Sequence, residues 1–135
     1  MFGRRKVIPE SLRPAWDAFR AQADRVESAR RALLSCLPVG RVDPVPVPVG
    51  LDLLRDELDA VADELAAWRR PEVEQPWHDC RAALDEARAA IPHAHEVATS
   101  TGELEELLDA VSDVVEPLDA WHEAERAWLA LRVRA

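Results

Sequence analysis

Residues 51–70 read LDLLRDELDAVADELAAWRR, and the spacing of the apolar side chains in this stretch decides the fold. Apolar residues recur at every third or fourth position, which places them on one face of an α-helix. Pro71 follows directly and should end the helix. The predicted apolar face consists of Leu51, Leu54, Leu58, Val61, Leu65 and Trp68.

The same spacing recurs in three other stretches and predicts helices over about 10–37, 73–98 and 102–132. In the first of them the apolar positions form a heptad-like stripe of Leu12, Trp16, Phe19, Ala23, Val26, Leu33 and Leu37, interrupted by Arg30. In the last one the stripe is wider than a single seam. Such a width indicates either a deeply buried helix or a face for self-association.

Prolines inside these stretches predict irregularities. Pro92 should end the helix near Ile91 or kink it, and Pro117 should bend the last helix in its middle. Ser100-Thr101-Gly102-Glu103 has the spacing of a capping box, so we expect the last helix to begin there.

Residues 38–50 read PVGRVDPVPVPVG, in which alternating proline cannot continue a helix. The pattern predicts an extended polyproline-II linker that crosses between the first and second helices. An alternative interpretation is a ligand for a proline-binding domain, which also needs an exposed segment.

Short connections after the second and third helices force those neighbours to be antiparallel. The sequence therefore predicts an all-α protein in which residues 9–135 form one domain, an antiparallel four-helix bundle. We expect up-down-up-down order and a left-handed supercoil. Residues 1–8, which include the basic run Arg4-Arg5-Lys6, are expected to form a flexible N-terminus.

The composition limits the partners. The formal net charge of −9 argues against nucleic acid and against an anionic membrane surface. No apolar stretch approaches the roughly 20 residues of a membrane span, and the N-terminus lacks a signal-peptide core. We therefore expect a cytoplasmic location. Sixteen of the 17 basic residues are arginine, which is typical of a GC-rich bacterial genome.

In an up-down-up-down bundle, all five tryptophans fall at one end, where the first helix begins and the last one ends. We call this the tryptophan end and the opposite one the proline end. Tryptophans there can fill the space between diverging helices, or they can line a pocket or a docking surface. The candidate ligand or partner residues are Trp16, Trp68, Trp77, His78, Arg81, Trp121, His122, Glu125 and Trp128.

Polar residues at seam positions suggest specific pairs. Glu125 follows Trp121 on the seam and should be partly buried, with Arg81 at the right level to pair with it. Arg30 either pairs with Asp56 or Asp59 on the second helix or extends its head to solvent.

The two cysteines fall at opposite ends of the predicted bundle. A helix of about 20 residues is about 30 Å long, whereas a disulfide allows a Cα separation of up to about 7 Å. We therefore expect Cys36 and Cys80 to be thiols.

Motifs for chemistry are lacking in the sequence. Asp119 and His122 form the single acid-x-x-His pair, and His78 and Cys80 are two residues apart and cannot share a helix face. No glycine-rich phosphate loop or nucleophile elbow is present. We predict no catalytic residue, no metal and no cofactor, and we incline against an enzyme.

Two functions are consistent with these patterns. The first is a non-enzymatic interaction module that binds a protein partner or itself, for example as a homodimer through the last helix. The second is a small-molecule or metal-binding bundle, with or without enzymatic activity, that uses the tryptophan end. A tightly packed tryptophan cluster favours the first, and a cavity with convergent Glu125, His122 and Arg81 favours the second.

Overall fold

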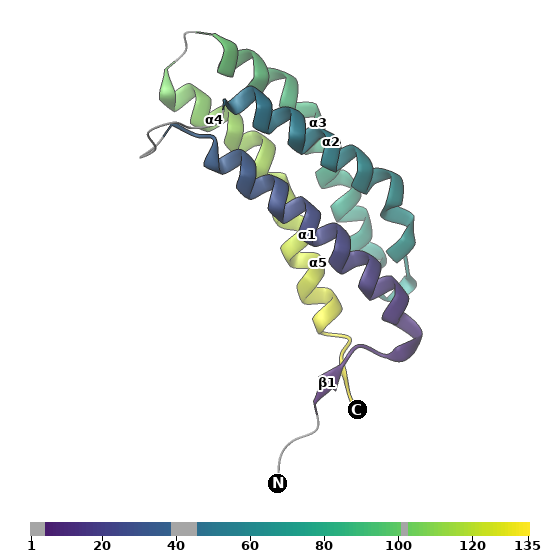
Figure 1. Ribbon diagram of the computed structural model, residues 1–135. Helices are drawn as coiled ribbons and strands as arrows, with labels where there is room; N and C mark the ends of the chain where they lie inside the picture. The colour runs from purple at the N-terminus through teal and green to yellow at the C-terminus, as the bar shows by residue number, and fades with distance from the viewer. Residues whose placement is uncertain (1–4, 39–45, 101–102) are drawn as a thin grey trace.

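Four long helical segments pack against one another in the computed structural model, which describes residues 5–38, 46–100 and 103–135 (Figure 1). The predicted all-α bundle is confirmed. The elements are η1 (Glu10–Leu12, a 3-10 helix), α1 (Arg13–Ser35), α2 (Val47–Glu64), η2 (Leu65–Trp68), η3 (Pro71–Val73), α3 (Glu74–Thr99), α4 (Leu104–Val115), η4 (Glu116–Asp119) and α5 (Ala120–Leu129).

Neighbouring segments are antiparallel, because contacts between them join an early residue of one to a late residue of the next. The handedness of the supercoil stays a prediction. The contacts that set the order are Gln22–Glu64 and Cys36–Gly50 between α1 and α2, Asp59–Arg88 and Asp52–His95 between α2 and α3, Cys80–Ala120 between α3 and α5, and Arg20–Glu125 between α1 and α5.

The helix α2 begins at Val47, four residues before the predicted start. Pro46 is its N-cap and Pro48 lies in the first turn, where a helix tolerates proline because the N–H groups there have no intrahelical partner. The prediction of a polyproline linker is therefore wrong for residues 47–50, and residues 39–45 lie outside the described part of the chain.

The helix α3 continues through Pro92 to Thr99, close to its predicted extent over about 73–98, and does not end near Ile91. The predicted start of the last helix needs correction. The helix α4 begins at Leu104 with Glu103 as its N-cap, while Ser100 is the C-cap of α3. At Pro117, where a bend is predicted, the 3-10 segment η4 interrupts the helix and separates α4 from α5.

The core face of α1 is rotated from the predicted stripe. Its buried residues are Ala15, Phe19, Gln22, Val26, Ala29 and Leu33, whereas Trp16, Ala23 and Leu37 are only partly buried. On the flank of α1 toward α2, Gly50 of α2 lies close to Leu33 and Cys36. A Cβ atom on Gly50 of α2 would lie 2.8 Å from the Cys36 Sγ atom, so a larger residue here would force the buried Cys36 side chain to shift.

The opposite flank of α1 faces η4 and α5 across a wider gap. The Cα atoms of α1 and α5 approach less closely than those of α1 and α2 or of α3 and α5. Long side chains span the gap, among them Trp16, Arg20 and Arg30 of α1. The long side chains of α1 on this flank thus lie only partly buried, between α1 and the segment η4–α5.

The chain ends meet beside the tryptophan end (Figure 1). Strand β1 (Lys6–Val7) pairs antiparallel with β2 (Val133–Arg134), and Ile8 is buried. The prediction of a flexible N-terminus is therefore wrong for residues 6–8. With four antiparallel segments, the chain ends at the same end of the bundle where it begins, so the C-terminal residues can pair with the N-terminal ones. Residues 1–4 lie outside the described residues.

Within the described ranges, no helix combines the length and the apolar character needed to cross a bilayer.

Candidate functional site

Four of the five tryptophans pack around Phe19, in the core of the tryptophan end. The Phe19 ring centroid lies 4.9 Å from that of Trp68, 5.8 Å from that of Trp121 and 6.1 Å from that of Trp128. Trp16 lies against both Phe19 and Trp128, at 5.9 and 5.8 Å. The predicted clustering is confirmed for these four residues.

The cluster is packed core. Trp68 and Trp128 have no exposed surface and Trp121 is 4% exposed, while Trp16 is partly buried. Aromatic pairs in edge-on or offset stacked arrangements each contribute about 0.5–1.5 kcal/mol beyond the burial of their area. The arrangement therefore stabilises the bundle and leaves little ring surface for a ligand.

Gln22 is the polar residue that the sequence analysis missed, and it is the one buried polar side chain among the described residues. Its Oε1 atom accepts a hydrogen bond from Trp68 Nε1 at 2.9 Å, and its Nε2 atom donates to the Glu64 carbonyl at 2.7 Å. Gln22 lies between Phe19 and Val26 at three-four spacing, which was the available signal.

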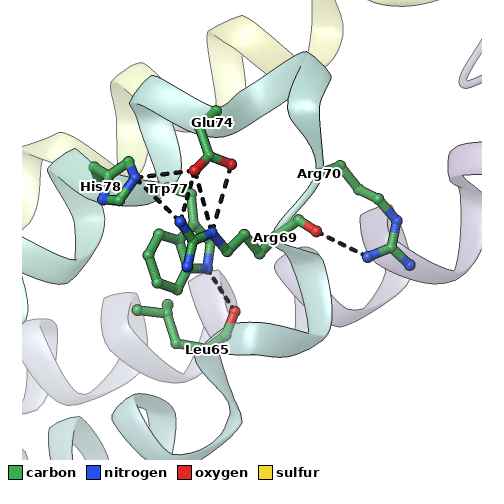
Figure 2. Close-up of polar contacts among 6 residues, drawn as sticks. All are labelled: Leu65, Arg69, Arg70, Glu74, Trp77 and His78. Atoms are coloured by element: carbon green, nitrogen blue, oxygen red, sulfur yellow. Dashed lines mark hydrogen bonds and ion pairs between the residues drawn. The ribbon is translucent and has the colours of Figure 1, made fainter.

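Trp77 lies apart from the cluster, at the corner where η2 leads into α3 (Figure 2). Its Nε1 atom donates to the Leu65 carbonyl at 2.8 Å. The Arg69 guanidinium lies 4.3 Å from the Trp77 ring centroid, and the Arg81 guanidinium lies 5.8 Å from it. These contacts hold the corner through cation–π attraction.

Arg69 also binds Glu74, which in turn contacts His78 (Figure 2). Arg69 NH2 lies 2.7 Å from Glu74 Oε1, and His78 Nε2 lies 3.0 Å from the same oxygen. The hydrogen bond from Arg69 lowers the pKa of the Glu74 carboxyl and raises the pKa of Arg69 itself. These groups are solvated, so they form a surface ion-pair cluster with little effect on stability.

Glu125 pairs with Arg20 and not with Arg81, which corrects the predicted pair. The Arg20 NH1 and Glu125 Oε1 atoms are 2.7 Å apart across the wide α1–α5 seam. Arg81 lies on α3 beside Trp77. The prediction that Glu125 is partly buried is confirmed.

Arg30 likewise binds neither Asp56 nor Asp59 of α2. Its guanidinium contacts Glu27 on its own helix at 3.3 Å and Asp119 of η4 at 3.6 Å. The rotation of α1 turns this side chain toward η4 and away from α2. The Arg30 Nε atom is buried without a hydrogen-bond partner in the described structure, as are Trp121 Nε1 and Trp128 Nε1.

A groove of about 250 Å³ lies in this α1–α5 seam. His122 contacts Glu27 at 3.7 Å along it, and Trp121 contributes to its wall. Glu125 and His122 therefore converge with Arg20 and not with Arg81. The charged groups of the groove pair with one another, so it offers no unpaired charge of one sign to a ligand. The lining is Arg20, Ala23, Asp24, Val26, Glu27, Arg31, Leu118, Trp121, His122 and Glu125.

Reactive groups do not gather anywhere in the described residues. No three His, Cys, Asp or Glu side chains lie together as a metal-binding group there. Cys36 and Cys80 are buried thiols at opposite ends of the bundle, as the sequence predicts. Burial raises the pKa of the Cys80 thiol, which keeps it protonated and unreactive at neutral pH.

Exposed apolar residues instead gather in the half of the bundle toward the proline end. Of the six large hydrophobic residues exposed in the described structure, five lie in this half, and the sixth is Val133 of β2. They come from the end of α1 and the beginnings of α2 and α4, and they are Leu34, Val49, Leu53, Leu104 and Leu108.

Comparison of the chain with protein-family models, with curated proteins and with solved structures finds no match. The function must therefore be argued from the molecule itself.

Proposed function

We propose that this protein is a non-enzymatic interaction module that associates with a second copy of itself through the first turns of α4. The observation that carries the proposal is the exposure of Leu104 and Leu108, at 46% and 37%. These residues are four apart and share one face of the helix. Leu107 beside them is partly buried against the core.

The rest of the molecule supports an interaction role over a chemical one. The aromatic residues that would line a pocket are packed into the core around Phe19. The Cys80 thiol is buried, and the groove in the α1–α5 seam holds mutually paired charges. What remains without a packing partner is apolar surface, which marks contact sites on proteins when it is contiguous.

The charge of α4 gives the proposed contact a distinctive salt dependence. The helix contains four acidic residues and no basic one, namely Glu105, Glu106, Asp109 and Asp113. A two-fold contact through α4 brings like charges of the two copies near each other. Salt screens such repulsion, so we expect self-association to strengthen as ionic strength rises.

Sedimentation equilibrium tests the proposal on the full chain at about 50 mM and about 300 mM NaCl. We expect a reversible dimer that is more populated at the higher salt concentration. The double substitution Leu104→Gln and Leu108→Gln should abolish it, by weakening association about tenfold or more.

The matched control is Leu53→Gln, which removes an even more exposed leucine from α2 and should leave the dimer intact. A chain that is monomeric at about 100 µM and both salt concentrations contradicts the proposal, because a contact weaker than this has little specificity. Equal loss of the dimer in the control would place the contact elsewhere.

A further inference from the structure

A groove on the described surface lies between α1 and α2, toward the proline end. It measures about 590 Å³ and is open to solvent. The walls are formed by Asp24, Arg25, Ser28 and Ala29 of α1 and by Leu53, Asp56 and Glu57 of α2. None of these residues belongs to the tryptophan cluster or to α4.

Leu53 gives the groove an apolar wall. It is 55% exposed, more than any other large hydrophobic residue in the described structure. Ser28 and Ala29 have short side chains, so a partner could approach the α1 backbone closely at this point. An apolar side chain placed here would cover Leu53 and remove it from water.

The charge of the groove is asymmetric. Arg25 is the one basic residue in the lining, and its Nε atom already binds Glu57 at 2.9 Å. Asp24 and Asp56 lie on opposite walls and keep side-chain exposures of 70% and 71%. Each contacts only an arginine of its own helix, at 3.4 and 3.8 Å. The groove thus presents two largely exposed carboxylates beside an apolar wall, each paired at a long distance with an arginine that lies outside the lining.

We propose that the α1–α2 groove docks a basic amphipathic helix of a partner protein. Leucine-type residues of that helix cover Leu53, and arginine or lysine residues pair with Asp24 and Asp56 on the two sides. Charge complementarity selects this occupant, because three of the four charged residues in the lining are acidic. The site is separate from α4 and does not depend on self-association.

Fluorescence anisotropy with a defined probe tests this docking. The probe is a fluorescein-labelled synthetic helix of about 14 residues, roughly four turns, with leucine on one face and arginine on the other. We expect saturable binding that weakens as NaCl rises, which is opposite to the salt effect on the α4 contact. A peptide with glutamine in place of every arginine should bind at least about tenfold more weakly.

Substitutions in the groove should change the dissociation constant in a graded way. Leu53→Asn should raise it about tenfold, and Asp24→Asn or Asp56→Asn about threefold each. The control Asp113→Asn removes the same charge from α4 and should change it less than about twofold. In two-dimensional NMR spectra, the shifted amide signals should be those of residues 24–29 and 53–57.

Two results would overturn the proposal. One is an equal loss of affinity in Asp56→Asn and Asp113→Asn, which would mean non-specific attraction to an acidic surface. The other is full affinity in Leu53→Asn. The double variant Leu104→Gln and Leu108→Gln should bind the probe normally, so failure of the α4 contact and failure of this groove are distinguishable.

Discussion

The two ends of the bundle use their apolar side chains in opposite ways. At the tryptophan end, Trp68, Trp121 and Trp128 are buried around Phe19. At the proline end, smaller residues such as Leu53 and Leu104 remain exposed. A cluster of large aromatic residues in a sequence can mark the end of a bundle where the space between diverging helices must be filled. The contact surface can lie elsewhere, where leucine side chains are not covered by a neighbouring helix.

The largest expected effect contrasts one substitution at each end. Trp68→Ala removes a side chain with no exposed surface, and we expect it to lower the free energy of unfolding by about 3–5 kcal/mol. Leu53→Ala, its counterpart in the proline half, should change that free energy by less than about 0.5 kcal/mol. Urea titrations followed by circular dichroism measure both. A loss below about 1 kcal/mol for Trp68→Ala would contradict the view that the cluster is a structural core.

An intermediate effect on the free energy of unfolding is expected at Gln22, the buried polar residue of the tryptophan end. Gln22→Met keeps the side-chain volume but leaves Trp68 Nε1 and the Glu64 carbonyl without this partner. A buried donor without its acceptor costs about 1–3 kcal/mol, so we expect a loss in that range from urea titrations. The chain's other glutamine, Gln75, is exposed, and Gln75→Met provides the control. Equal stabilities of the two variants would show that Gln22 has no structural role.

The smallest expected effect tests the wide seam of α1 against the corner at Trp77. A double-mutant cycle of Arg20→Gln and Glu125→Gln should give a coupling energy of about 0.5 kcal/mol, as is usual for a partly exposed ion pair. The same cycle with Arg81→Gln and Glu125→Gln should give a coupling near zero, because Arg81 lies beside Trp77. A larger coupling in the second cycle than in the first would mean that Glu125 faces α3 in solution.

The sequence by itself determined the all-helical class, the positions of the helices and the gathering of the tryptophans. These properties follow from local periodicity and from antiparallel alternation, which need no knowledge of distances between helices. An irregularity at Pro117 was also predictable, since proline removes a hydrogen-bond donor from the helix.

The tertiary structure alone decided the rotation of α1 and everything that depends on it. A three-four stripe leaves the orientation of the helix about its own axis undetermined to within a residue or so, and packing against the neighbouring helices fixes it. The rotation buries Gln22 and turns Arg30 toward Asp119. It also places Arg20, and not Arg81, within ion-pair distance of Glu125. Packing also decides which leucines stay exposed, because the burial of a side chain depends on the distance to the neighbouring helix and not on its hydrophobicity alone.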